Sequence, residues 1–278
     1  MAAEKENWTI DGIDWGRFDP SKVDPDILLL VKAASLVEYN GGDYATYLAN
    51  VFSDDESFCD AAHLWAGEEV KHGEALGRWA QMVDPDFDFE GSFKRFRDGF
   101  HLHLEAEESV RGSRSGELVA RCMVEIGTSS YYSSLAEAAE EPVLKEICQH
   151  IAADELRHYK LFYTHLKRYL DKERIGRLRR FLIAASRFKE TEDDELSYAF
   201  YAANSPEGTD YDRRYYNRAY INRAFRYYSR KQCQRGMAMM WKAAGLNPQS
   251  RLVDLAGYGV HAFARWRGRQ IPPAQALS

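Results

Sequence analysis

Apolar side chains recur every three or four positions over most of the first 170 residues, and this is the spacing of one face of an α-helix. Asp24 followed by Pro25 is typical of a helix start, because aspartate accepts the first free backbone N–H groups and proline fits the first turn. No segment alternates apolar and polar residues as a strand would. The pattern predicts an all-α protein with four long helices, at about residues 25–52, 58–79, 115–139 and 142–170.

The remaining segments have weaker patterns. Residues 1–22 place Gly, Asp and Pro among aromatic residues and are expected to be irregular. Residues 93–112 are expected to form a connecting helix, so that the bundle and its connection occupy residues 23–170. A helical period continues afterwards, and it predicts a C-terminal helical extension over residues 171–268 that packs on the bundle. Residues 269–278 are expected to be a disordered tail.

Ionisable side chains interrupt the apolar stripe of each long helix. In the second helix, Glu69 and His72 stand between Trp65 and Leu76, at positions where the period calls for apolar residues. The fourth helix repeats this arrangement, and the first and third helices each contribute one glutamate. The pattern therefore directs six metal-ligating side chains at the core: Glu38, Glu69, His72, Glu125, Glu155 and His158.

Four carboxylates in one core require a counter-charge. A buried carboxylate costs several kcal/mol unless it is paired or coordinated, and four of them would also repel one another. Two divalent cations would balance their charge, and oxygen and imidazole ligands suit iron or manganese. The Glu-x-x-His spacing places both groups one turn apart on the same helical face, where they can bind one ion. We therefore predict a cofactor of two Fe ions, with an Fe/Mn pair as an alternative.

The two halves of the predicted bundle resemble each other in sequence. Glu38 precedes Glu69 by 31 positions, and Glu125 precedes Glu155 by 30. The segments "EEVKH" and "DELRH" both read acid, Glu, any residue, base, His. Metal-bound histidines usually donate their second nitrogen to a carboxylate, so the preceding acids are candidates for this role: Asp154 with His72, and Glu68 with His158. Each acid could instead simply be solvated.

Composition narrows the function classes. The net charge of −6 disfavours a general nucleic-acid binder, and no apolar run is long enough to span a membrane. The N-terminus shows no secretory signal, which favours a cytoplasmic location. The four cysteines are far apart and form no C-x-x-C pair, so neither a disulfide framework nor a cysteine-ligated metal is expected.

The order Glu, Glu-x-x-His, Glu, Glu-x-x-His resembles the ferritin-like di-iron carboxylate superfamily. Within it, "WAGEEVKHG" from Trp65 and "DELRH" from Asp154 are most similar to the soluble acyl-carrier-protein desaturases, and Thr128 stands where those proteins place a threonine beside the dioxygen site. Lys71 replaces the usual arginine, and the first-helix acidic segment does not align cleanly. Glu38 is assigned from the internal repeat, with Asp43 as the fallback.

The resemblance implies a ferritin-like four-helix bundle and a di-iron oxidoreductase that activates dioxygen. Its substrate would be an apolar chain, either free or attached to acyl carrier protein. Thr128 would act beside bound dioxygen, unless its hydroxyl only bonds back to its own helix. Because no P-loop or dinucleotide-binding motif appears, electrons would come from a separate ferredoxin or reductase. A homodimer is also expected.

Two basic segments bear on the choice of function, and two functions besides that of a desaturase or oxygenase stay open. For the desaturase interpretation, basic residues of the segment 160–180 could dock an acidic carrier; four candidates are Lys167, Arg168, Arg177 and Arg180. Alternatively, the Arg- and Tyr-rich segment 213–231 suits phosphates and stacked bases, as in a ferritin-like tRNA hydroxylase. Both stretches could equally be solvated or intersubunit helix faces. The third possibility is a ferritin-like protein that stores iron or removes peroxide.

Overall fold

A computed structural model describes residues 8–190 and 194–270, and every regular element in these ranges is helical, as predicted. Three short 3-10 helices precede the first α-helix, at Ile10–Gly12, Trp15–Arg17 and Pro20–Lys22. The α-helices are α1 (Pro25–Tyr39), α2 (Gly41–Val51), α3 (Glu56–Val83), α4 (Phe89–Gly99), α5 (Arg114–Ala138), α6 (Pro142–Glu173), α7 (Arg177–Glu190), α8 (Asp194–Asn204), α9 (Arg213–Tyr227), α10 (Arg230–Ala243) and α11 (Arg251–Gly268).

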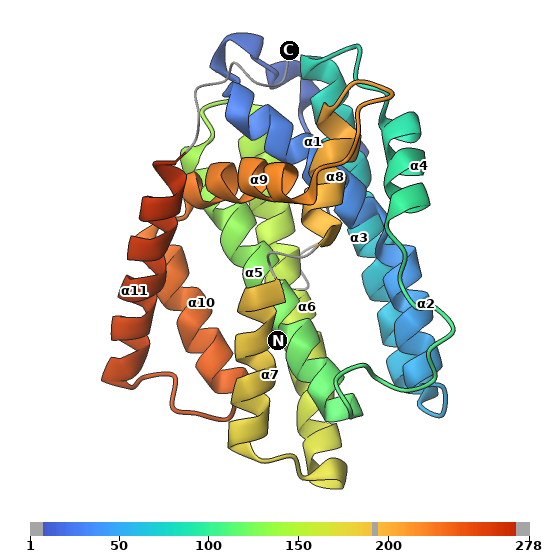
Figure 1. The fold of residues 1–278 in the computed structure, drawn as a ribbon, viewed down its shortest axis with the longest axis vertical. Coiled ribbons are helices and arrows are strands. Elements are labelled where there is room, and N and C mark those ends of the chain that lie inside the picture. Colours follow the sequence, from blue (N-terminus) through green and yellow to red (C-terminus); the bar gives the residue numbers. More distant parts are fainter. Residues whose placement is uncertain (1–7, 191–193, 271–278) are drawn as a thin grey trace.

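The predicted bundle consists of four helical columns, namely α1 with α2, α3, α5 and α6, which can be followed in Figure 1. Helices α1 and α2 pack along α3, α5 packs along α6, and α3 contacts α6. This arrangement is compatible with a ferritin-like bundle. None of the helices within the described residues has the length and apolar character needed to cross a membrane.

The first column is two helices, where the sequence analysis expected one continuous helix. The break falls at Asn40, whose backbone conformation (φ −81°, ψ 7°) ends α1 and begins α2. Gly41 then passes very close to α3, since a Cβ atom at this position would come within 2.6 Å of the Glu69 Cβ atom. The break therefore lets the column bend around α3 two residues after Glu38.

The connecting helix was predicted over residues 93–112, but α4 covers Phe89–Gly99, and residues 100–113 contain no helix. The N-terminus of α4 is displaced because Asp88 caps it by accepting a hydrogen bond from the Gly91 backbone N–H at 2.9 Å. The segment after α4 draws hydrogen bonds from neighbouring side chains, as when the Asn50 side chain donates to the Leu104 carbonyl at 2.7 Å.

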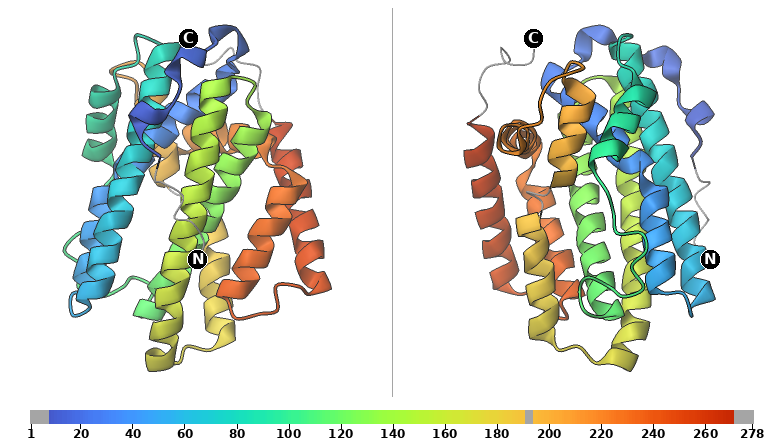
Figure 2. Two further views of the ribbon diagram at one scale, coloured as in Figure 1. Left: turned by 180° about the vertical axis from the view of Figure 1, so that it is seen from behind. Right: turned by 45° about the vertical axis from the view of Figure 1, so that its right-hand side comes forward.

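The C-terminal helices pack against the bundle on one side (Figure 2). Helix α8 contacts α1, α10 contacts α5, and α9 joins α8 to α11. The Arg- and Tyr-rich helix α9 is partly buried: Tyr216, Tyr220 and Arg223 are all buried, and the Arg223 Nε atom lies 2.9 Å from the Asp26 carboxylate. The expected tail of residues 269–278 lies outside the described residues, apart from its first two.

The apolar core consists of two clusters, and the predicted ligands lie at the junction between them. Along α3, residues Phe58 to Ala66 belong to one cluster and Ala75 to Ala80 to the other. Along α6 the order is reversed, with the change between Ala152 and Tyr159. Each of the four helical columns packs in one cluster along one part of its length and in the other cluster along the rest. The ligand glutamate of each column lies where the column changes from one cluster to the other.

We predict that Gly41→Ala lowers the free energy of unfolding by about 1–3 kcal/mol, because the added methyl group would overlap Glu69 in a tightly packed layer. The matched control is Gly42→Ala, where a Cβ atom meets nothing within 4 Å. This second change should be neutral or should stabilise the fold by less than about 1 kcal/mol. Urea unfolding of both variants measures the difference, and equal stability would contradict the close approach of α2 to α3.

Candidate metal centre

Two groups of buried side chains could each hold a metal ion among the described residues. The first combines Glu38, Glu69, His72 and Glu155, and the second combines Glu69, Glu125, Glu155 and His158. In each group, one ligand atom from every residue lies within 4.8 Å of the others. Glu69 and Glu155 belong to both groups, so they are placed to bridge two ions. The structure thus brings together all six residues that the sequence analysis named.

The fallback residue lies elsewhere. The Asp43 carboxylate is 3.2 Å from the Arg97 guanidinium, on the side of α2 that faces α4. Glu38, in contrast, is buried and its Oε2 atom lies 3.4 Å from the Nδ1 atom of His72. Glu38 is therefore the first-column ligand candidate that the geometry favours.

Both histidines direct Nδ1 toward the cluster and Nε2 away from it. The His72 Nδ1 atom lies 3.3 Å from Glu155 Oε1, and the His158 Nδ1 atom lies 3.0 Å from Glu69 Oε1. On the far side, His72 Nε2 lies 3.1 Å from Asp154 Oδ2, and His158 Nε2 lies 2.7 Å from Glu68 Oε2. A proton on Nε2 would bond to the acid and leave the Nδ1 lone pair free for a metal.

Several buried polar atoms in the cluster lack the hydrogen bonds that buried groups normally make. Within the described residues, both carboxylate oxygens of Glu125 have no hydrogen-bond partner, nor do Glu69 Oε1, Glu155 Oε1 and His158 Nδ1. All of these atoms face the same layer of the bundle. Metal ions would satisfy them, because each is a lone-pair donor of a type that iron and manganese accept. The residues present therefore fit a di-metal centre.

The electrostatics of the metal-free cluster show the same need for positive charge. Burial and the neighbouring Glu69 carboxylate raise the pKa of Glu38 well above its usual value, and burial and Glu155 do the same for the pKa of Glu125. Although burial opposes it, the surrounding carboxylates raise the pKa values of His72 and His158 well above normal. Without metal, protons on these groups supply the charge that the carboxylates require.

Thr128 lies beside the cluster on α5, half-buried. Its hydroxyl oxygen is 2.6 Å from Glu155 Oε2 and 3.2 Å from the carbonyl oxygens of Val124 and Glu125. The hydroxyl is therefore close both to carbonyl groups of its own helix and to a carboxylate of the ligand cluster, and the contact with the carboxylate is the shorter one. A hydroxyl bonded to a carboxylate is the stronger interaction.

Two aromatic residues at the site were missed by the sequence analysis. Tyr132 donates its hydroxyl to Glu38 Oε1 at 2.6 Å, and the Trp8 indole N–H donates to Asp154 Oδ2 at 2.8 Å. The Trp8 ring is also parallel to that of His72, with 6.1 Å between centroids. Tyr132 follows Glu125 by two helical turns, a spacing that could have indicated it. Trp8 lies outside any periodic segment, so no pattern indicated its place.

Lys71, which stands where the similar desaturases have an arginine, contacts the outer acid Asp154. Its ammonium group lies 3.5 Å from Asp154 Oδ2 and 4.4 Å from the centroid of the Trp8 ring. The lysine therefore joins the same outer contact as the indole, while hydrogen bonds from His72, Arg157 and Trp8 lower the pKa of Asp154 against the effect of burial.

The predicted partner-binding residues occupy the end of α6 and the start of α7. Lys167 and Arg177 are exposed, whereas Arg168 and Arg180 are half-buried. The Arg168 guanidinium contacts the Asp55 carboxylate, and Arg180 packs against Gly245. The structure thus leaves two of these four side chains free to face solvent.

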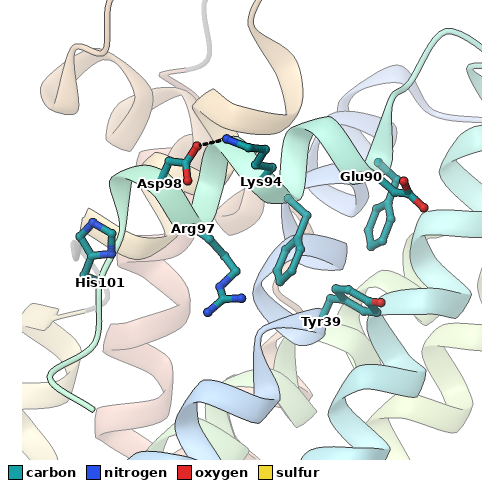
Figure 3. Close-up of a pocket in the computed structure, with 8 residues that line it drawn as sticks. Tyr39, Glu90, Lys94, Arg97, Asp98 and His101 are labelled. Atoms are coloured by element: carbon teal, nitrogen blue, oxygen red, sulfur yellow. Dashed lines mark hydrogen bonds and ion pairs between the residues drawn. The ribbon is translucent and has the colours of Figure 1, made fainter. Parts of the chain in front are cut away.

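A pocket of about 610 Å³ lies on the outer side of α1, between Tyr39 and α4 (Figure 3). Its lining combines aromatic and charged side chains, namely Tyr39, Phe89, Glu90, Phe93, Lys94, Arg97, Asp98 and His101. Tyr39 follows Glu38 in the chain, but its ring faces α4 while Glu38 belongs to the core cluster. The pocket is thus separated from the ligand cluster by α1.

A model of the family described as fatty acid desaturase matches residues 42–181 of this chain. The matched range contains five of the six ligand candidates, and Glu38 lies just before it. A comparison with curated proteins finds no match.

We predict that Glu69→Ala removes metal binding at both positions, because Glu69 belongs to both ligand groups. Metal analysis after anaerobic loading with Fe²⁺ should give about two ions per chain for the unaltered protein and less than about half an ion for the variant. Glu74→Ala is the matched control, since Glu74 is an exposed glutamate of the same helix. Normal loading of Glu69→Ala would show that the cluster is not the metal site.

Metal affinity should also depend steeply on pH. Groups with raised pKa values hold protons near neutral pH, and a metal ion must displace them. Lowering the pH adds protons, so the affinity should fall by at least about tenfold per pH unit, with proton release on binding. Titration calorimetry with Mn²⁺ in buffers of different ionisation enthalpy would measure this release. A pH-independent affinity between pH 6 and 8 would contradict the description.

Proposed function

Because the chain belongs to the fatty acid desaturase family, we propose that it is a dioxygen-dependent di-iron oxidoreductase of the desaturase or oxygenase type. The observation that carries the proposal is the pair of four-ligand groups joined through Glu69 and Glu155. Two ferrous ions bound there would supply the electrons and open coordination positions for the reduction of dioxygen. The same ligand types also suit a manganese and iron pair.

Two hydroxyl groups have distinct roles in this proposal. Tyr132 holds the Glu38 carboxylate in place through its 2.6 Å hydrogen bond, so that one oxygen remains directed at the cluster. Thr128 bonds to the shared carboxylate of Glu155 and is only half-buried. Its hydroxyl can therefore hold a proton beside the ligand cluster, and its partial exposure allows that proton to be exchanged with groups outside the cluster.

The contact of Trp8 with Asp154 offers a path by which electrons enter. The half-exposed Trp8 indole donates a hydrogen bond to Asp154, and Asp154 is hydrogen-bonded to His72. These two hydrogen bonds connect the protein surface to the ligand cluster. The chain supplies no dinucleotide-binding motif, so the electrons would come from a separate ferredoxin or reductase. Such a partner would dock near Trp8, on the α3 and α6 side of the bundle.

An apolar acyl chain is the substrate class that the observations favour. The family points to a fatty acyl substrate, and apolar side chains adjoin the ligand cluster on both sides. Exposed Lys167 and Arg177 could contact an acidic acyl carrier. The tRNA alternative depends on the Arg- and Tyr-rich helix α9, where Tyr216, Tyr220 and Arg223 are buried within the protein. Arg214, Tyr215 and Arg218 of the same helix are exposed, and these are the residues that a nucleic acid would contact.

We predict that Thr128→Val lowers acyl-chain oxidation at least tenfold while two iron ions remain bound, because only the hydroxyl group is lost. The control is Thr46→Val, where an exposed threonine of α2 bonds to its own helix through Gly42. Reduced, iron-loaded protein is mixed with dioxygen and fatty-acyl carrier protein, and the products are identified by mass spectrometry.

The possible outcomes test the role of Thr128 and the substrate class separately. Equal product from Thr128→Val and Thr46→Val would remove the proposed role of Thr128. Absence of any oxidised acyl product from the iron-loaded unaltered protein would contradict the substrate class. Faster oxidation of the reduced centre with tRNA than with acyl carrier would move the proposal to the hydroxylase alternative.

A further inference from the structure

Arg121 is a buried arginine whose capacity for hydrogen bonds is not filled by the fold. It lies on α5, one turn before the ligand candidate Glu125, and it is only 7% exposed. Within the described residues its Nε atom has no hydrogen-bond partner. A guanidinium group is always charged and carries five N–H donors, and buried donors normally have acceptors. The side chain is therefore placed as if a further acceptor belonged beside it.

The nearest carboxylate, that of Glu117, balances the charge of Arg121 without hydrogen-bonding to its Nε atom. Glu117 Oε1 lies 3.7 Å from Arg121 Nε, beyond the range of a hydrogen bond. Glu117 Oε2 instead accepts the Tyr47 hydroxyl at 2.9 Å and the Ser109 hydroxyl at 2.7 Å, and these two bonds hold the carboxylate in place. The Tyr44 ring lies against the guanidinium, with 4.9 Å between the Arg121 Cζ atom and the ring centroid. The Nε–H donor is thus left for another acceptor.

Arg121 shares one side of α5 with Thr128. Positions 121, 124 and 128 follow at steps of three and four, so their side chains form a row that spans about 10.5 Å along the helix. Val124 and Thr128 are half-buried and Gly127 is exposed, whereas residues 125 and 126 are buried. A Cβ atom at Gly127 would meet nothing within 4 Å, so solvent reaches the middle of α5 beside the row. At the end of the row, the Thr128 hydroxyl is bonded to Glu155 Oε2 at 2.6 Å.

We propose that Arg121 binds the carboxylate of a free fatty acid, whose apolar chain extends along this row toward Thr128. A carboxylate has two acceptor oxygens, which match the N–H groups of a guanidinium and form short, charge-assisted hydrogen bonds. Tyr44, which contacts the guanidinium, packs against the apolar cluster that contains Ala45 and Leu48 of α2. The fatty acid therefore meets a cation at one end and apolar side chains next to it. Its role as substrate rests on the proposed function, but the carboxylate site does not.

The site distinguishes a free acid from an acyl chain on a carrier. A thioester with acyl carrier protein has no carboxylate charge, so it brings no anion to Arg121. A free acid supplies both the missing acceptor and a compensating charge, which a buried guanidinium requires. We therefore expect Arg121 to favour the free acid over chains with a neutral end, because only the acid satisfies the buried donor.

Titration calorimetry of the full chain, loaded with Fe²⁺ and kept free of dioxygen, tests the proposal with decanoate and decanol as probes. Arg121→Met should weaken decanoate binding at least about thirtyfold, because a buried charge pair loses one partner. The affinity for decanol should change less than about twofold, since decanol has no charge to lose. Arg251→Met is the matched control, because Arg251 is exposed on α11, and it should leave both affinities unchanged. Circular dichroism should show equal helix content in all variants.

A second variant keeps the test valid if Arg121→Met does not fold. Glu117→Gln removes the negative charge beside Arg121, so decanoate should bind at least about threefold more tightly, with decanol unaffected. The proposal is overturned if decanoate does not bind the unaltered protein, if Arg121→Met leaves its affinity unchanged, or if Glu117→Gln does not increase it. Because binding is measured without dioxygen, a failure of acyl oxidation would count against the proposed function and would not alter this result.

Discussion

Four carboxylates that share one buried layer are the constraint on which the rest of the structure depends. They lie at the junction of the two apolar clusters, where water cannot stabilise their charge. The fold meets part of this need through two histidines, each bonded to an outer acid. The remaining oxygens without partners define where positive ions would be bound. Stability and metal binding are therefore coupled, because ions that bind only the folded chain stabilise it.

The same constraint explains how closely the helices approach one another at this level. A Cβ atom at Gly73 would come within 2.5 Å of the Tyr39 backbone nitrogen, and one at Gly41 within 2.6 Å of the Glu69 Cβ atom. These two glycines flank the ligand layer on facing columns, and they let Glu38 reach Glu69 and His72. The short distance between α1–α2 and α3 is thus a requirement of the site, and the break at Asn40 accommodates it.

The sequence was sufficient for the parts of the fold that depend on periodic burial. The long helices α3, α5 and α6 appear as stripes, and charged residues inside those stripes identified the ligand candidates because such positions are costly unless they are used. The break after Tyr39 was missed because Gly41 fits the apolar period, although Asn40-Gly41-Gly42 is a turn signal; the close contact with Glu69 that the break serves arises only in three dimensions. Trp8 was missed because its partner Asp154 is 146 residues away.

The central claim is that one layer of six side chains holds two metal ions. Crystals of the iron-loaded protein, measured on both sides of the iron absorption edge, test it most directly through anomalous difference density. The account predicts two peaks per chain, one beside Glu38 and His72 and the other beside Glu125 and His158, both within bonding distance of Glu69 and Glu155. A single peak, or peaks away from these residues, would contradict it.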